Sequence, residues 1–348
     1  MDGLYLVGEP IFKVPCREEY YAPVSTTALC REVLKETEDK NKVIDKLREE
    51  YLAIIWSLVD MDINFRIIYA HEKEIDQRTF GVCASYMKCR FASFSEGFFP
   101  PYVAYPRDFS VVLPGMLLVN YKVGELKIKE KDGCRIVGSP YGDGGRVLFS
   151  KDTVLVSERL VGKDDRSRAA ESGDLEKIRE EGIKVGMIPC PLVQIFLASG
   201  ETDRLFFNDH LDRIACLIEG RDGNLHLVID PNLFTANWKG ENGIFWTPRS
   251  PEETLEVIKK VCNPLGIEVH CLKKLRVPYA LNLIQFPDGQ ILMTGGDDFA
   301  AETIKGIVGW DMVFKTPVPI RFFPVFCYAG IHCLVSEAPL PLLKKIPS

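Results

Sequence analysis

The sequence lacks any apolar run near the length of a membrane span. A helix needs about 20 consecutive apolar residues to cross a bilayer, and no run in the 348 residues approaches that length. The first residues, MDGLYLVGEP, also lack the basic start and apolar stretch of a secretory signal. We therefore expect a cytoplasmic protein with no membrane partner.

An excess of positive charge is missing as well. The 43 Lys and Arg residues are outnumbered by 49 Asp and Glu residues, so the net charge is −6. A nucleic-acid-binding protein needs clustered positive charge to meet the phosphates. No GxGxxG motif follows a strand-like segment, and the Gly-Gly at 295–296 lacks the Lys and Ser/Thr of a phosphate-binding loop. We expect neither a nucleic-acid partner nor a cofactor.

Cysteine is plentiful, but its spacing lacks the patterns of common zinc sites and disulfide frameworks. No CxxC pair occurs. The 11 cysteines cannot all pair within one chain because their number is odd, and a chain of this length can build a core without disulfides. We expect a reducing compartment in which most cysteines are small buried hydrophobic side chains. At most one or two should be reactive thiolates.

From residue 109 onward, the sequence predicts a series of β-hairpins. Each has two apolar runs joined by turn residues, in which Gly supplies a positive φ and Pro or Asp starts the turn. Residues 324–336 are a candidate for a fifth strand pair. The four predicted strand pairs are 109–113 with 116–120, 147–149 with 153–157, 214–218 with 225–229, and 283–286 with 291–294.

Helices and single strands separate several hairpins. Apolar residues at helical spacing predict a helix over 43–58, and 65–70 is strand-like. Further helices are predicted at 174–181, 251–262 and 299–308, and strand-like runs follow the last two at 266–272 and 311–315. The resulting unit of hairpin, helix and strand recurs over roughly 60–70 residues, longer than solenoid repeats. The pattern alone leaves open a circular arrangement of units or an ordinary α+β domain.

Four short segments beside these elements carry chemically useful side chains. A circular arrangement would bring all four to one mouth, where a thiol, an imidazole and several carboxylates would meet. Each segment alone is common for structural reasons, so the interpretation depends on their occurrence together. The segments are YPRD at 105–108, GDGGR at 142–146, NDHLD at 208–212 and GIHC at 330–333.

This inventory suits a reaction on a cationic substrate. A Cys nucleophile must be a thiolate, and a nearby imidazole or bound cation lowers its pKa. Several carboxylates in one pocket repel one another unless a cation neutralises them. A guanidinium fits best, because its planar fork of donors matches carboxylates. On an extended strand His210 and Asp212 would lie on one face, so the His can serve the chemistry while the Asp holds the cation.

The order RD, DGG, HLD and GIHC resembles the guanidino-group-modifying superfamily, the penteins, over residues 105–339. Its members include arginine deiminase, agmatine deiminase, dimethylarginine dimethylaminohydrolase and arginine:glycine amidinotransferase. The resemblance implies an α/β fold, a five-bladed pseudosymmetric propeller of ββαβ units. We expect one such domain over 1–348, with residues 1–62 a mostly helical N-terminal segment.

The resemblance also implies roles for individual residues. Cys333 takes the place of the nucleophile and His210 that of the general acid and base. Asp108 and Asp212 fall where the family's guanidinium-binding carboxylates lie. Asp143 falls where many members have Glu-Gly-Gly-Asp and some have Asp-Gly-Gly-Asp, so it is also assigned to substrate binding.

Two positions raise further questions. Arg146 replaces the final Asp of the Glu-Gly-Gly-Asp motif, and would either turn away from the pocket or bind an anionic part of the substrate. His332 precedes Cys333, and on a strand adjacent side chains point to opposite faces, so a structural role is expected for it.

The resemblance implies a hydrolase, a deiminase or dihydrolase, that acts on arginine or a related guanidino compound through a covalent thiouronium. An amidinotransferase that passes the amidino group to an amine is the alternative. A non-catalytic pentein binding protein is the second alternative. The expected partner is the small-molecule guanidino substrate, and a homo-oligomer is left open.

Overall fold

The computed structural model of the chain describes a set of ranges separated by gaps. Within these ranges, no helix is both long and apolar enough to cross a membrane. Three positions of the predicted motifs and hairpins lie outside the described residues, namely 105, 109 and 209. The described ranges are 4–8, 19–36, 40–69, 90–93, 106–108, 110–120, 130–131, 134–158, 173–197, 202–208, 210–239 and 245–337.

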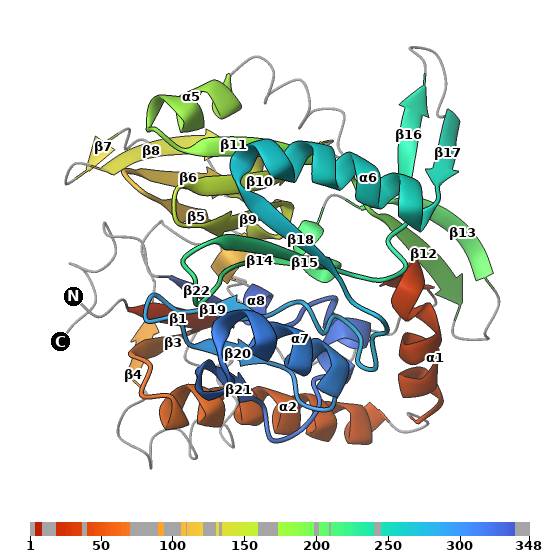
Figure 1. Cartoon of the computed structure of the whole chain (residues 1–348). Helices are drawn as coiled ribbons and strands as arrows, with labels where there is room; N and C mark the ends of the chain where they lie inside the picture. Colours follow the sequence, from red (N-terminus) through yellow and green to blue (C-terminus); the bar gives the residue numbers. More distant parts are fainter. Residues whose placement is uncertain are drawn as a thin grey trace.

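Five sheets of the described chain share one pattern, in which an antiparallel strand pair is extended by a third strand parallel to the second (Figure 1). This is the ββαβ pairing predicted from the hairpins. Four of the units are β5 (Ser110–Leu113), β6 (Met116–Asn120) and β8 (Cys134–Ser139); β9 (Val147–Ser150), β10 (Thr153–Ser157) and β11 (Lys184–Ile188); β14 (Ala215–Glu219), β15 (Leu225–Ile229) and β18 (Ile267–Cys271); and β19 (Ile284–Gln285), β20 (Ile291–Met293) and β21 (Val313–Lys315).

The fifth unit joins the two ends of the chain. Strand β22 (Val335–Glu337) pairs antiparallel with β1 (Tyr5–Gly8), which lies parallel to β3 (Phe65–Tyr69). Figure 1 shows β22 and β1 side by side although they are at opposite ends of the sequence. The five units therefore close through a pairing between the N-terminal and C-terminal strands.

The end of the predicted segment 324–336 belongs to a fifth strand pair, in which β22 pairs with β1. The residues before β22 are not extended and form a π-helix at Phe323–Cys327 and a short helix, α8 (Ile331–Leu334). The local apolar pattern reveals neither these helices nor a partner strand more than 300 residues away.

The four predicted hairpins and the later helices are confirmed. Helix α5 (Asp174–Glu180) connects β10 to β11, α6 (Pro251–Cys262) lies between β15 and β18, and α7 (Asp298–Val308) connects β20 to β21. The start of α6 explains its position, because Ser250 and Glu253 form a reciprocal capping box on either side of Pro251.

Residues before 62 contain two helices, α1 (Thr27–Lys35) and α2 (Lys40–Asp60), together with strands β1 and β2 (Glu19–Pro23) that the sequence analysis did not predict. Other strands lie outside the five-unit pattern. They are β4 (Arg90–Ser93) beside β3, β7 (Glu130–Lys131) beside β8, β12 (Leu192–Leu197) and β13 (Thr202–Phe207) with β2, and the hairpin of β16 (Thr235–Lys239) and β17 (Phe245–Arg249).

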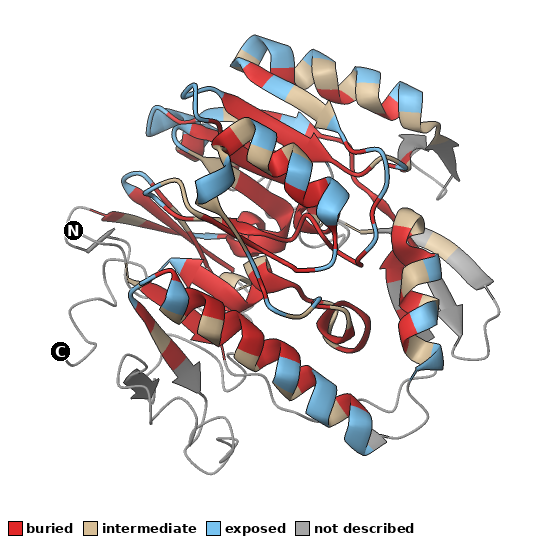
Figure 2. Ribbon diagram, turned by 60° about the horizontal axis from the view of Figure 1, so that its bottom comes forward, coloured by how far each residue is buried: buried red, intermediate tan, exposed pale blue. Residues whose placement is uncertain are grey.

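Helix α2 buries one face against the fifth unit and the segment that leads to Cys333. Figure 2 shows this helix with a buried face turned toward the rest of the protein and an exposed face turned outward. Its buried side chains pack in one cluster with Phe323 and Val335. The buried positions of α2 in that cluster are Val43, Leu47, Tyr51, Ile54, Ile55 and Leu58.

One buried carboxylate on α2 holds the start of the π-helix. Glu50, 3% exposed, accepts hydrogen bonds from the backbone N–H groups of Arg321 at 2.6 Å, Phe322 at 2.8 Å and Phe323 at 3.0 Å. These N–H groups are among the ones that a helix start leaves without partners. Burial raises the pKa of Glu50 to about 7, against the opposing effect of the three N–H groups.

We expect Glu50→Ala to destabilise the protein strongly, because it leaves several buried N–H groups without an acceptor at about 1–3 kcal/mol for each. Urea unfolding measures the loss. Glu49→Ala is the matched control, since the Glu49 side chain is 47% exposed and pairs only with Lys46 among the contacts that the structure describes; its effect should stay within about 0.5 kcal/mol. Equal destabilisation by both variants would contradict the capping role.

Candidate active site

The predicted site residues lie at corresponding places, just before the first strand of their units. Asp108 ends the turn η3 (Pro106–Asp108) before β5, and Asp143 caps η6 (Gly144–Arg146) before β9. His210 caps η7 (Leu211–Arg213) before β14, and Cys333 lies in α8 before β22. Turn η3 packs against both α8 and η6, and η6 packs against η7. The fold therefore brings the four sequence segments together.

The Cys333 thiol lies against the Asp212 carboxylate. Its Sγ is 3.4 Å from Oδ2 of Asp212, and the Nδ1 atom of His332 is 3.2 Å from the same oxygen. Cys333 is 4% exposed and Asp212 1%. Because a carboxylate only accepts hydrogen bonds, both the thiol and the imidazole donate to Asp212 in this arrangement.

Asn282, which the sequence analysis missed, connects these groups. Its Nδ2 donates to the backbone oxygen of Asp212 at 3.2 Å and lies 3.5 Å from Sγ of Cys333, while its Oδ1 accepts from the backbone N–H of His332 at 2.8 Å. Gly330 allows this approach, since a Cβ there would overlap the Asn282 amide. Gly330, which precedes IHC in the sequence, was the available sign that another part of the chain approaches closely here.

A second cluster contains His210 and Asp143. The Nε2 atom of His210 is 3.4 Å from Oδ2 of Asp143, and Nε of Arg146 is 3.5 Å from that oxygen. Gly145 lets the backbone pass beside the imidazole, because a Cβ at this position would overlap the His210 ring. The Gly-Gly pair in the DGG segment therefore serves the packing of the histidine as well as the turn.

This pairing sets the protonation of His210. Burial by itself lowers the pKa of His210, but the Asp143 carboxylate outweighs burial and raises it to about 9. Burial by itself would raise the pKa of Asp143, but His210 and Arg146 bring it down to about 2. At neutral pH the pair is therefore an imidazolium and a carboxylate, and His210 can give up a proton.

The Cys333 thiol, by contrast, tends to keep its proton. Burial, followed by the charges of Asp212 and Asp108, raises the pKa of Cys333 well above its ordinary value. Burial and the charge of Asp143 also raise the pKa of Asp108 to about 7. In both shifts burial is the first cause and the neighbouring carboxylates are the second, while the buried guanidinium of Arg213 acts against them. A further cation bound beside the carboxylates would favour the thiolate.

Two carboxylate oxygens in this region have no hydrogen-bond partner among the described residues. They are Oδ1 of Asp108 and Oδ1 of Asp212, and both are buried. An unsatisfied buried acceptor costs free energy, so buried polar atoms of this kind indicate a missing ligand or water. Donors of a bound cation would satisfy them.

The contacts of Arg146 and His332 bear on the two open questions from the sequence. The Arg146 guanidinium turns to Asp143 and donates to the backbone oxygen of Pro140 at 3.2 Å. His332 lies in a helix instead of a strand, so it does not point away from Cys333; both contact Asp212. Burial, with the nearby charge of Arg107, lowers the pKa of His332 to about 4 and keeps it neutral.

A cavity of about 770 Å³ reaches this region from the side of the hairpin turns. Arg107, Asp212 and His332 line its inner part, and the turns at 150–151, 219–221 and 287–289 line its outer part. Cys333, His210, Asp143 and Asp108 are not among the described residues that line it. The described lining therefore reaches the Asp212 carboxylate that contacts the thiol, but not Cys333 itself.

Comparison with known proteins adds evidence on the fold. No family model matches the sequence, and no curated protein matches it. A solved structure of a putative agmatine deiminase has a TM-score of 0.51 at 10% identity, over 97% of this chain and 93% of that chain. The N-terminal domain of ArgZ, a cyanobacterial arginine dihydrolase, has 0.48 at 12% identity, over 97% and 98%. DDAH from Pseudomonas aeruginosa has 0.47 at 13%, over 97% and 100%.

The likeness to the putative agmatine deiminase and the five repeated sheets define the class of fold. The protein has the mixed α/β architecture of the penteins, as the motif order indicated. At 10% identity the likeness carries the fold and not the reaction, which depends on the residues of the site.

Replacing Asp212 with Asn should make the Cys333 thiol more reactive. The change removes a negative charge that raises the thiol pKa, and each unit of decrease gives about tenfold more thiolate at a pH below that pKa. Alkylation by iodoacetamide at pH 7.5, followed peptide by peptide by mass spectrometry, measures the rate at Cys333. The exposed Cys271 is an internal control whose rate should not change. Slower labelling of Cys333 in this variant would contradict the electrostatic account.

Proposed function

We propose that this protein is a Cys-dependent hydrolase of guanidino compounds, with Cys333 as nucleophile and His210 as general acid and base. The observation that supports the proposal is a buried thiol beside carboxylate oxygens that have no described hydrogen-bond partner, in the same region as a protonated histidine. Asp108 and Asp212 each have a buried oxygen without a described partner, and Asp212 lies 3.4 Å from Sγ of Cys333. A site of this kind accepts a cation before it reacts.

A guanidinium meets both requirements of the site. Its N–H donors lie in one plane and can bind carboxylates in pairs, which suits the open oxygens of Asp108 and Asp212. Its positive charge offsets the two carboxylates that raise the pKa of Cys333. Substrate binding therefore lowers the pKa of the thiol, which loses its proton to solvent and becomes a thiolate. In the empty site the thiol stays protonated and unreactive.

The first half of the reaction forms a covalent intermediate. The Cys333 thiolate attacks the central guanidinium carbon, and a C–S bond forms in a tetrahedral adduct. The C–N bond to the leaving nitrogen then breaks while the His210 imidazolium gives that nitrogen its proton. An S-linked thiouronium remains on Cys333, and His210 is left neutral.

The second half restores the enzyme. Neutral His210 takes one proton from water as the water oxygen attacks the thiouronium carbon. The C–S bond then breaks and Cys333 leaves as thiolate, while the second proton of the water is released to solvent as the ureido carbonyl forms. Asp143 keeps His210 oriented and stabilises its charged form through both steps. With water as the acceptor the products are a ureido compound and ammonia or an amine. An amine acceptor would make the protein an amidinotransferase, but the hydrolase needs only one substrate site.

A screen of guanidino compounds tests the proposal. We expect the wild-type protein to release ammonia, an amine or urea from arginine, agmatine or a related compound without an added acceptor. Cys333→Ala should reduce turnover by several orders of magnitude while substrate binding, measured by calorimetry, persists. The matched control is Cys216→Ala, since Cys216 is a buried core thiol. Full activity of Cys333→Ala would refute the assignment, and product only with glycine or ornithine present would indicate the amidinotransferase.

The pH dependence of turnover tests the role of Asp143. His210 must be protonated to act as the acid, and its pKa of about 9 depends on Asp143. In Asp143→Asn the pKa of His210 falls toward the ordinary 6.5, so the proton is lost at lower pH. We expect the alkaline limb of the kcat profile to move down by more than one pH unit, with a lower kcat at pH 8. An alkaline limb at the same pH in both proteins would contradict this role.

A further inference from the structure

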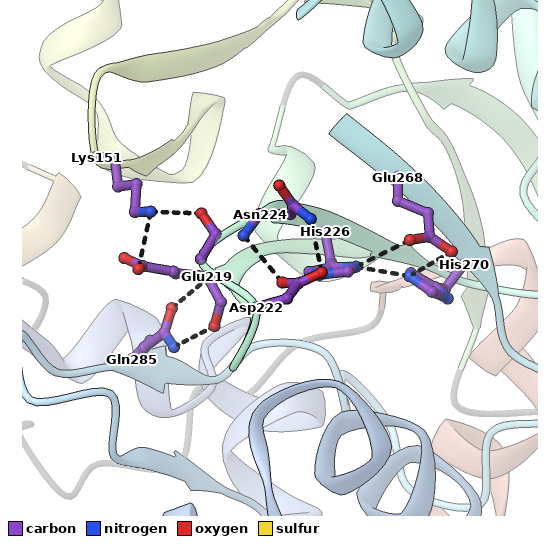
Figure 3. Close-up of polar contacts among 9 residues, drawn as sticks. Lys151, Glu219, Asp222, Asn224, His226, Glu268, His270 and Gln285 are labelled. Carbon is purple, nitrogen blue, oxygen red and sulfur yellow. Dashed lines mark hydrogen bonds and ion pairs between the residues drawn. The ribbon is translucent and has the colours of Figure 1, made fainter. Parts of the chain in front are cut away.

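A second group of chemically active side chains lies away from Cys333, on the third unit of the fold. His226, Glu268 and His270 come from the neighbouring strands β15 and β18, and their nitrogen and oxygen atoms all lie within 4.8 Å of one another (Figure 3). His226 follows the turn between β14 and β15, whereas Asp212 precedes β14. The group therefore lies at the opposite end of this hairpin from the active site.

The parallel register of β15 and β18 creates the group. Leu225 to Ile229 pair with Ile267 to Cys271, so His226 lies directly beside Glu268. His270 is two residues further along β18, and alternate residues of a strand share one face. All three side chains consequently meet on the same face of the sheet.

The distances suit a metal ion among the three side chains. Nδ1 of His226 is 2.9 Å from Nε2 of His270, and the two Glu268 oxygens lie 3.7 Å from the His226 nitrogen and 3.6 Å from the His270 nitrogen. Ligands at about 2.0–2.2 Å around a tetrahedral zinc are roughly 3.3 Å apart. Each of these three distances is within about 0.5 Å of this spacing.

We propose that His226, Glu268 and His270 bind a divalent transition-metal ion of the zinc class, with the fourth position open to water. Two imidazoles and one carboxylate are a ligand set that zinc commonly takes when it keeps an open position. The three side chains line a cavity of about 660 Å³ that also contains Trp310, which is 64% exposed. Solvent can therefore reach the open position.

A neighbouring carboxylate orients the first ligand. Oδ1 of Asp222 lies 3.3 Å from Nε2 of His226, on the side of the ring away from the group. A carboxylate at this nitrogen holds the proton there and leaves Nδ1 with a free lone pair, as in many metal-bound histidines. Gly220 makes room for this ring, since a Cβ there would overlap Nε2.

The other ligands meet the requirements of charge and access. Both imidazoles would bind the metal in their neutral form and the carboxylate would bind it ionised, so the three side chains together would carry one negative charge. The Glu268 side chain is 66% exposed and that of His270 is 26% exposed, so both can adjust. The ammonium group of Lys305 also lies in this cavity, 4.4 Å from the centre of the Trp310 ring. This contact with the ring offsets part of the Lys305 charge.

Metal titration of the full-length protein, freed of metal by a chelator, tests the site. With Zn²⁺ in competition with a chromophoric chelator, we expect one tight equivalent. Glu268→Gln and His270→Ala should each weaken binding by more than the roughly 10–100-fold loss typical of removing an outer-shell partner, and Asp222→Asn should show a loss in that range. Both substituted ligands are on the surface, so folding of the variants is verified from their melting temperatures without metal.

Glu256→Gln is the matched control, because the side chain of Glu256 on α6 is 67% exposed, close to that of Glu268; its affinity should equal that of the wild type. Co²⁺ in place of Zn²⁺ distinguishes this site from the cysteines, since thiolate ligands produce a strong ultraviolet charge-transfer band and nitrogen and oxygen ligands do not. A thiolate band, or tight binding that survives both Glu268→Gln and His270→Ala, would overturn the proposal.

Discussion

The pairing of β22 with β1 is the constraint on which the site depends. This pairing joins the last strand of the chain to the first and completes the fifth unit. Helix α8, which carries Cys333, immediately precedes β22, so closing the sheet also positions the thiol against Asp212 of another unit. Glu50 supports the same segment from α2 by capping the π-helix. Fold closure and assembly of the candidate site are therefore one event.

The candidate site combines buried carboxylates with buried cations, which include the Arg107 and Arg213 guanidiniums. Asp143 is balanced by His210 and Arg146, and burial strengthens that pairing. Asp108 and Asp212 keep oxygens without a described partner, although neutral His332 donates to Asp212. Buried acceptor oxygens of this kind favour a ligand that brings N–H donors. In the proposed guanidino chemistry the positive charge of the substrate adds to that of the buried arginines and generates the thiolate only when substrate is present. The proposed metal group at the far end of the third unit follows another logic, because its two imidazoles and one carboxylate already lie close together without a buried excess of charge.

Local signals predicted more of this fold than long-range ones. The hairpins were recognisable because their turns contain Gly, Pro and Asp at positions that need them, and helix α6 because Ser250 and Pro251 mark its start. Strand β1 was missed, since four apolar residues near an end carry no sign of a partner at 335–337. The expected orientation of His332 was wrong for a related reason, because a strand was predicted where the structure has a short helix. The structural role expected for His332 stays a prediction.

The sequence by itself determined the set of reactive groups, their order along the chain and the turns that present them, because these depend on residue identity and near neighbours. Only the tertiary structure decided which groups touch. Asn282, in the segment before β19, contacts Cys333 of α8, and His226 of β15 contacts His270 of β18; the two members of each pair are 44 or more residues apart. Such contacts depend on sheet register and on close backbone approach at Gly330 and Gly220, neither of which a single sequence reveals. The pKa values follow from the same packing, since burial and neighbouring charge set them.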